Sequence, residues 1–179
     1  MIGVLVSGAG SNLQALLDAG LPVRAVASNK QSAAGLQRAA HLPTASFELR
    51  DYPTRDERDA AMADWLAGHG VELVVLAGYM HILTPAFLRR FPDRVINVHP
   101  SLLPDFPGAH AVADQLAAGV REAGATVHVV DEGVDSGPIL VQERVPVHDG
   151  DTVESLHERI KQVEHRLLPQ AVEELLCAR

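Results

Sequence analysis

Short apolar runs of strand length alternate with segments of helical periodicity along this 179-residue chain. Apolar residues in the helical segments recur at three- and four-residue spacing, as on helices with one buried face. Strands are expected at Gly3–Val6, Val23–Ala27, Leu73–Leu76, Val95–Val98, Thr126–Val130 and Ile139–Glu143, and helices at Asn12–Ala19, Ala33–Ala40, Asp56–Leu66, Pro85–Phe91, Ala111–Ala117 and Thr152–Leu176. This order predicts the α/β class, with an open, mostly parallel, twisted, Rossmann-like sheet that carries helices on both faces.

The second half of the chain departs from strict alternation. A proline-containing loop, Pro100–His110, precedes two strands that only the short segment Asp131–Pro138 separates. Such a short connection predicts antiparallel pairing of these two strands. Pro169 predicts a kink or a break in the last helix. Because no linker is long enough to divide domains, we expect residues 1–179 to form a single domain.

The amino-acid composition argues against several classes of protein. The chain has 15 basic and 23 acidic residues, a formal charge of −8, and no basic run, which argues against a nucleic-acid partner. A single cysteine, Cys177, rules out an intrachain disulfide framework and a cysteine-based zinc cluster. No stretch approaches the roughly 18 apolar residues that a membrane span needs, and the first residues do not read as a signal peptide. We therefore expect a cytoplasmic protein.

The segment Ser7–Asn12 joins the first strand to the first helix. Its glycines allow a ligand close to the backbone, and a helix N-terminus favours a phosphate. The dinucleotide fingerprint fails, since Leu13 stands at its third glycine and Asn29-Lys30 replaces the ribose-binding acid. A mononucleotide phosphate fits better than a nicotinamide cofactor, and a plain tight turn with a helix cap remains an alternative.

Asn97 and His99 end a buried strand, and alternate residues of a strand share one face. Ligands bind at the carboxyl ends of strands in such sheets. An amide beside an imidazole can hold a carbonyl oxygen and pass a proton, although a hydrogen-bonded strand cap is the simpler reading. A later loop, Asp131–Pro138, lacks the calcium-loop spacing and is expected to place one carboxylate against another side chain. Whether Asp135 reaches His99 stays open at this point.

The last helix carries Glu164 between Val163 and Leu167 on its apolar stripe, with Lys161 one turn earlier. A carboxylate on a face that meets the core needs a partner. The alternative is that Glu164 lies at the edge of the stripe and reaches solvent.

Four segments in combination resemble the glycinamide ribonucleotide formyltransferases, which depend on 10-formyltetrahydrofolate. They are Ser7–Gln14, Leu76–Leu83, Asn97–Pro104 and Asp131–Pro138, and the similarity runs from Val4 to about Pro169. The resemblance implies a sheet of the formyltransferase type, with a phosphate-binding half at residues 1–95 and a catalytic and folate-binding half at 96–179. It also implies transfer of a formyl group to the amino group of 5'-phosphoribosylglycinamide in de novo purine synthesis.

The resemblance also implies residue roles. The catalytic residues would be Asn97, His99 and Asp135. The substrate phosphate would be bound by Gly10, Ser11 and Asn12, and its ribose and glycinamide by Lys161, Gln162, Val163 and Glu164. The folate would be bound by Arg55, Met80, His81, Ile82, Leu83, Asn97, Asp131, Glu132, Gly133, Val134 and Asp135. His110 would lie on an adjacent mobile loop, and no metal ion is implied.

Two departures from the family pattern concern ligand affinity. His81 stands where an arginine is common, and Asp105-Phe106-Pro107 replaces a more basic loop. The alternatives are another 10-formyltetrahydrofolate-dependent formyltransferase, a formyltetrahydrofolate hydrolase, or a catalytically silent binding module. Relatives that act on tRNA or hydrolyse the folate typically carry an extra domain. The expected partners are small-molecule substrates, with no nucleic acid and no membrane, and the protein is expected to be a monomer or homodimer.

Overall fold

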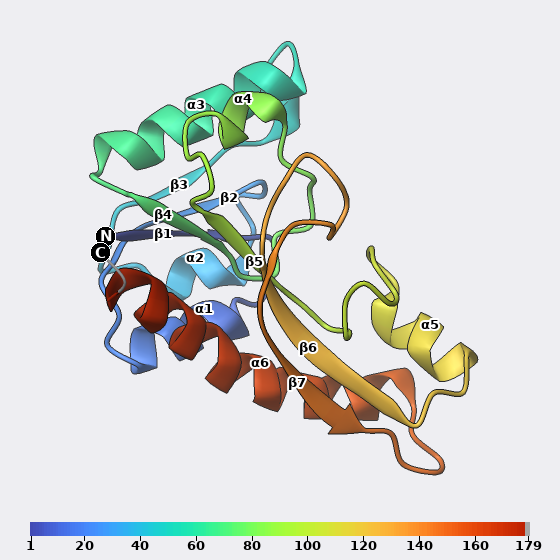
Figure 1. Ribbon diagram of the computed structural model, residues 1–179. Coiled ribbons are helices and arrows are strands. Elements are labelled where there is room, and N and C mark those ends of the chain that lie inside the picture. The colour runs from blue at the N-terminus through green and yellow to red at the C-terminus, as the bar shows by residue number, and fades with distance from the viewer. Residues whose placement is uncertain (178–179) are drawn as a thin grey trace. The chain divides into compact units, whose positions relative to one another are not determined.

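A computed structural model describes residues 1–177, which cluster into two compact units (Figure 1). The first unit is Met1–Asn97, and the second runs from Val98 to the C-terminal end. The boundary falls inside strand β5 (Val95–His99). The strands form one seven-stranded sheet in the order β3-β2-β1-β4-β5-β6-β7, so the predicted α/β class with a mostly parallel sheet is confirmed.

The first unit contains the parallel strands. They are β1 (Ile2–Val6), β2 (Val23–Ser28), β3 (Thr44–Ser46), β4 (Leu73–Leu76) and the start of β5. Every residue of β1 and β4 is buried, as expected for parallel strands whose two faces are both covered by helices. Leu5 on β1 is level with Ala27 on β2 and with Leu76 on β4, so these strands end at one edge of the sheet.

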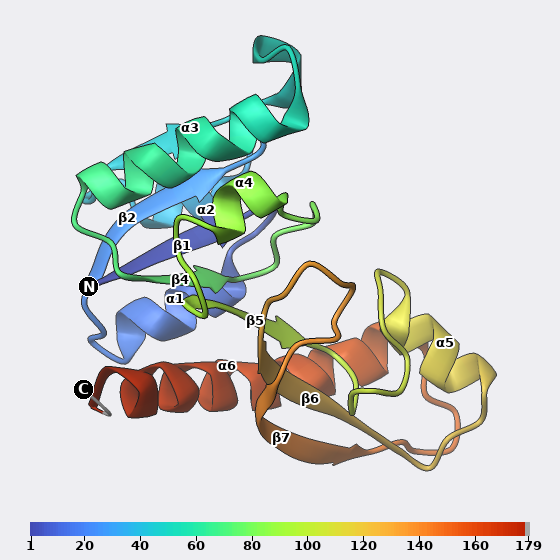
Figure 2. The ribbon, with the colours of Figure 1, turned by 45° about the horizontal axis from the view of Figure 1, so that its top comes forward.

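The helices of this unit cover both faces of its strands. They are α1 (Ser11–Asp18), α2 (Ala34–Arg38), the short 3₁₀ helix η1 (Leu49–Asp51), α3 (Arg55–Gly68) and α4 (Pro85–Leu88). Helices α1 and α2 lie on one face, and α3 and α4 on the other (Figures 1 and 2). Right-handed crossovers explain this, because the chain reverses its direction of travel across the sheet at β1.

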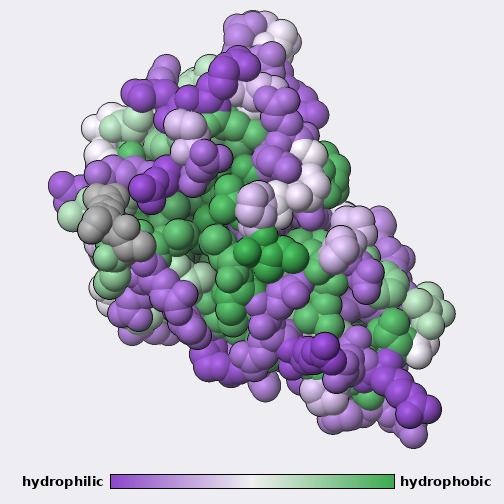
Figure 3. Space-filling model, viewed as in Figure 1, coloured by the Kyte–Doolittle hydropathy of each residue, from purple (hydrophilic) through white to green (hydrophobic). Residues whose placement is uncertain are grey.

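Helix α3 is amphipathic. It begins at Thr54, whose Oγ1 accepts a hydrogen bond from the backbone N–H of Glu57 at 3.1 Å. Met62, Ala63 and Leu66 are buried on its inner face. The outer face of α3, at the top of the space-filling view, is mainly hydrophilic (Figure 3).

The second unit is built on an antiparallel pair, as the short connection predicts. It contains β6 (Glu122–Val129), β7 (Ile139–Pro146), α5 (Ala111–Ala117) and α6 (Val153–Cys177). Helix α6 packs on β6 and β7 through an apolar stripe that includes Leu156, Ile160 and Leu167. A kink or a break was predicted at Pro169, and the break is wrong, because the helix continues through this residue. Strand β3 and helix η1 were not expected, because both are only three residues long.

Candidate active site

The carboxyl ends of β1, β2 and β4 bring polar groups together within the first unit. The Ser7 hydroxyl oxygen lies 2.6 Å from Oδ1 of Asn29, and it accepts a hydrogen bond from the backbone N–H of Met80 at 2.9 Å. Ser7 also donates its own backbone N–H to the carbonyl of Gly78 at 3.1 Å. The start of the Ser7–Asn12 segment is thus tied to the segment that follows β4.

Gly10 holds the turn into α1 in a conformation that favours glycine. Its φ is +73°, and an added Cβ atom would lie 2.7 Å from Cα of Gly35. The backbone N–H of Gly35 donates to the carbonyl of Gly8 at 2.9 Å, which packs this turn on the start of α2. No side-chain hydrogen bond caps α1, and the N-terminus of a helix can bind an anion through its first N–H groups.

Arg38 adds a positive charge beside this turn, and no motif in the sequence predicts it. Its Nε donates to the carbonyl of Ala9 at 2.6 Å, and its Nη1 donates to Oε1 of Gln14 at 3.3 Å. Arg38 ends α2, more than twenty residues away in sequence, so only the fold reveals this proximity.

The segment Met80–Leu83 combines exposed and anchored residues. Met80 is 63% exposed and Ile82 is 55% exposed, whereas Leu83 is buried. Arg55, at the start of α3, donates to the carbonyl oxygen of Ile82 at 2.5 Å. Two large exposed apolar side chains on an anchored backbone are suited to contact an apolar ring of a ligand.

A buried ion pair on α3 supports the same segment. Nε of Arg58 lies 2.7 Å from Oδ1 of Asp59, without the alignment of a hydrogen bond, and both side chains are fully buried. Oδ2 of Asp59 accepts from the backbone N–H of Thr84 at 2.7 Å, and Nη1 of Arg58 lies 2.9 Å from Nδ1 of His81. Burial, followed by the charges of Arg58 and Arg55, lowers the pKa of His81.

His99 and Asp135 meet in the second unit. Nδ1 of His99, at the end of β5, lies 3.3 Å from Oδ2 of Asp135. Asn97 precedes His99 by two residues on the same strand, so the two side chains belong to one face of β5. The structure therefore answers the question that the sequence left open, because Asp135 does reach His99.

His128 joins this pair and was missed in the sequence. Its Nε2 lies 3.5 Å from Oδ1 of Asp135. Burial on its own raises the pKa of Asp135, but the contact with His128, the backbone N–H of Gly108 and the charge of His99 together lower it. His128 sits inside an apolar strand without motif spacing, so no sequence signal marks it.

The loop before α5 closes on His99 from the other side. Nε2 of His99 lies 2.8 Å from the carbonyl oxygen of Phe106, and the hydroxyl of Ser101 donates to the same oxygen at 3.2 Å. Each ring nitrogen of His99 thus faces an oxygen that can accept a hydrogen bond. A ring that carries a proton on both nitrogens can donate to both oxygens. His110 is exposed and directly precedes α5.

The loop between β6 and β7 is held by its own side chains. Oδ1 of Asp131 accepts hydrogen bonds from the backbone of Gly133 at 2.9 Å and from the hydroxyl of Ser136 at 2.8 Å. Asp135 has a φ of +50°, which turns its carboxylate toward the histidines. Glu132 and Val134 are exposed on this loop.

The four residues of α6 that were predicted to bind ribose and glycinamide differ in their exposure to solvent. Glu164 is only 5% exposed, so the alternative that it reaches solvent is wrong. Val163 is buried and Gln162 is exposed, while the ammonium of Lys161 lies 2.6 Å from Oε1 of Glu158. A buried carboxylate on this face remains a candidate for ligand binding.

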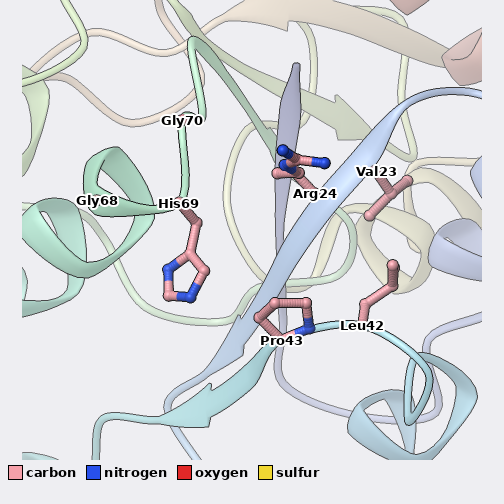
Figure 4. A pocket seen from close by; sticks show the side chains of 7 residues that line it. All are labelled: Val23, Arg24, Leu42, Pro43, Gly68, His69 and Gly70. Carbon is pink, nitrogen blue, oxygen red and sulfur yellow. The ribbon is translucent and has the colours of Figure 1, made fainter.

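A surface pocket of about 560 Å³ lies elsewhere, and none of the predicted site residues lines it (Figure 4). Arg24 and His69 supply its polar groups, with Val23 at the beginning of β2. This is the edge of the sheet opposite to Ser7 and Asn29, so we do not assign the chemistry to this pocket. Within residues 1–177 no cluster of histidine, cysteine and acidic residues is arranged to hold a metal ion. The described helices include none that could cross a membrane.

Comparison with known proteins identifies relatives over nearly the whole chain. The formyl transferase family model matches residues 1–172. Phosphoribosylglycinamide formyltransferase of Mycobacterium tuberculosis H37Rv is 53% identical over 94% of this chain and 81% of that protein. Among crystal structures, glycinamide ribonucleotide transformylase 1 of Symbiobacterium toebii has a TM-score of 0.93 and 47% identity, over 96% of this chain and 84% of that chain. Phosphoribosylglycinamide formyltransferase of Streptococcus pneumoniae TIGR4 has a TM-score of 0.94 and 40% identity, over 98% of both chains.

Proposed function

The chain belongs to the formyl transferase family. From that premise we propose that it transfers the formyl group of 10-formyltetrahydrofolate to the amino group of 5'-phosphoribosylglycinamide, a step of de novo purine synthesis. The observation that carries the proposal is the contact of His99 with Asp135 at the end of the strand that also presents Asn97. The identity to phosphoribosylglycinamide formyltransferase supports this substrate over others.

The chemistry is direct transfer. The substrate amine attacks the formyl carbon and forms a tetrahedral intermediate whose oxygen carries the negative charge. Asn97 donates its amide N–H to this oxygen, and protonated His99 donates a second hydrogen bond. The intermediate collapses with cleavage of the bond to the folate nitrogen, and the proton lost by the amine reaches that nitrogen through His99 or a bound water.

Asp135 orients and stabilises the imidazolium of His99 through Nδ1, which leaves Nε2 as the group that faces the reaction. In this structure Nε2 contacts the carbonyl oxygen of Phe106. The mechanism therefore requires this loop to release His99 when substrates bind.

The ligand-binding roles follow from the local geometry and from the family. We assign the substrate phosphate to Gly10, Ser11 and Asn12 at the uncapped start of α1. The ribose and glycinamide are assigned to Lys161, Gln162, Val163 and Glu164. We assign the folate to the two segments that carry the exposed apolar residues Met80, Ile82 and Val134, with Arg55 near its tail. The full set of proposed folate-binding residues is Arg55, Met80, His81, Ile82, Leu83, Asn97, Asp131, Glu132, Gly133, Val134 and Asp135.

The protein handles small molecules, and 10-formyltetrahydrofolate is its co-substrate in this proposal. We further propose a cytoplasmic location, no nucleic-acid or membrane partner, and a monomer or homodimer. We also retain the division into a phosphate-binding half at residues 1–95 and a catalytic and folate-binding half at 96–179, within a single domain.

A substrate panel tests the proposal against its rivals. Purified protein is incubated with 10-formyltetrahydrofolate and one of three acceptors: 5'-phosphoribosylglycinamide, charged initiator tRNA, or water alone. We expect formylated nucleotide and tetrahydrofolate only with the first acceptor. Release of formate without an acceptor would instead identify a hydrolase, and formylated tRNA would identify a tRNA-directed enzyme. Folate binding without turnover on any acceptor would identify a silent binding module.

A further inference from the structure

Four polar side chains of the first unit form a continuous chain of contacts. Nη1 of Arg58 lies 2.9 Å from Nδ1 of His81, and Nε2 of the same ring lies 3.2 Å from the Asn29 amide. The other end of the Asn29 amide lies 2.6 Å from the hydroxyl oxygen of Ser7, which accepts the backbone N–H of Met80 at 2.9 Å. Arg58 is fully buried and Asn29 is 5% exposed, while His81 between them is partly exposed.

The chemistry of Arg58, at one end of this series of contacts, restricts which ring nitrogen of His81 carries a hydrogen atom. An arginine guanidinium only donates hydrogen bonds, so Nδ1 of His81 has to accept from Arg58 with its lone pair. A histidine with a bare Nδ1 is neutral and carries its proton on Nε2. The lowered pKa of His81, caused by burial and then by the charges of Arg58 and Arg55, agrees with a neutral ring.

A proton on Nε2 of His81 needs an acceptor, yet Nδ2 of Asn29, also a donor, faces it at 3.2 Å. The two ends of an amide have the same shape, and their identity is decided by the hydrogen bonds around them. Turning the Asn29 amide places its oxygen opposite Nε2–H and its nitrogen opposite the Ser7 oxygen. Each contact between Arg58 and Ser7 then joins one donor to one acceptor.

We propose that His81 is a positioning residue, fixed by Arg58 as the Nε2–H tautomer, and that its proton orients the Asn29 amide with the oxygen toward the ring. Ser7 then accepts from both Asn29 and the backbone N–H of Met80. This series of contacts thereby links Ser7, the first residue of the Ser7–Asn12 segment, to the Met80–Leu83 segment. This role does not depend on the proposed function.

The tautomer is measured directly by long-range ¹H–¹⁵N correlation spectra of the protein labelled with ¹⁵N-histidine. The signals of His81 are assigned by their loss in His81→Gln. At neutral pH we expect the pattern of a neutral ring with a bare Nδ1 and a protonated Nε2. A ring protonated on Nδ1, or on both nitrogens, would overturn the proposal.

The variant Asn29→Asp tests the orientation of the amide. A carboxylate only accepts, so it preserves the acceptor that Nε2–H requires, and the His81 pattern should stay as in the wild type. If Asn29 instead donated to Nε2 in the wild type, the His81 proton would lie on Nδ1 there. The carboxylate of Asn29→Asp would then move this proton to Nε2, and the spectrum would report a different tautomer from that of the wild type. That change would contradict the proposal.

Arg58→Met and Arg55→Met form a matched pair. Arg58→Met removes the donor to Nδ1, and we expect His81 to populate both tautomers. Arg55→Met removes a neighbouring arginine that contacts the Ile82 carbonyl, not the ring, so the wild-type pattern should remain. An unchanged tautomer in folded Arg58→Met would refute the role of Arg58. If Arg58→Met does not fold, the wild-type spectrum and Asn29→Asp still decide.

Discussion

The carbonyl oxygen of Phe106 lies 2.8 Å from Nε2 of His99, where the proposed mechanism places the oxygen of the formyl group. The hydroxyl of Ser101 donates to the same carbonyl oxygen at 3.2 Å. Phe106 has a φ of +53°, a region that favours glycine, so this turn of the loop is strained. A backbone oxygen thus contacts the ring nitrogen that the proposed mechanism uses as donor, and that mechanism requires the substrate to displace it.

His99→Ala and Asn97→Ala should each lower kcat by about 10²–10³, the effect of removing one donor to an oxyanion. Binding of both substrates should change little, because these donors act mainly on the transition state. Steady-state kinetics on folded variants measure this, with His41→Ala as an exposed histidine control. A kcat within twofold of wild type for either variant would remove that residue from the mechanism.

Asp135→Asn isolates the charge of this carboxylate, because asparagine also tolerates the φ of +50° found there. The pKa of Asp135 in the folded protein lies below the usual value of an aspartate. Its charge therefore stabilises the protein above the unfolded pKa, and this stabilisation is lost as the pH falls through the folded pKa. At neutral pH we expect Asp135→Asn to lose about 1 kcal/mol, the scale of one hydrogen bond.

Urea unfolding of wild type and Asp135→Asn at a series of pH values provides the measurement. The difference in unfolding free energy should narrow below about pH 4, where unfolded aspartate takes up its proton. A difference that grows in acid would mean that Asp135 has a raised pKa, contrary to our interpretation.

Gly10→Ala should abolish phosphate-dependent binding of 5'-phosphoribosylglycinamide, because the added methyl group would lie 2.7 Å from Cα of Gly35. Gly20→Ala is the matched control, since Gly20 has a φ of +68° but no atom within 4 Å of the added Cβ. Both variants should lose about 1 kcal/mol from the left-handed backbone, and only Gly10→Ala should lose nucleotide affinity. Calorimetry with the nucleotide and its dephosphorylated nucleoside separates these effects. Equal affinity of the wild type for both compounds would show that the Ser7–Asn12 segment is only a turn.

Regular elements were predictable from the sequence because their signal is local. Apolar runs predicted strands β1, β2 and β4, and the short Asp131–Pro138 connection predicted the antiparallel pair β6 and β7. Strand β3 was missed because three residues are too few for a recognisable strand pattern. The predicted break at Pro169 was wrong, because α6 runs from Val153 to Cys177 with this proline inside it and buries residues on both sides of that position, such as Leu167, Leu168, Ala171 and Val172.

The site was predictable where motif residues are close in sequence and much less so elsewhere. Asn97 and His99 share a strand face, which follows from spacing alone. The approach of Asp135 to His99 and that of the Arg38 guanidinium to Ala9 join residues more than twenty positions apart. His128 is only seven positions from Asp135, but the two are separated by the turn after β6, and no motif links them. Such contacts depend on how the strands and helices pack, and no local pattern encodes them.

The central claim is that this chain transfers a formyl group to a ribonucleotide amine with His99 as a donor. The most direct measurement is a single turnover with 10-[¹³C]formyltetrahydrofolate and 5'-phosphoribosylglycinamide, in which mass spectrometry follows the label in the nucleotide. We predict that wild-type protein moves the label stoichiometrically into the nucleotide and that His99→Ala does so about 10²–10³ times more slowly. Label that stays on the folate or appears as formate with the wild type, or equal rates for both proteins, would contradict the account.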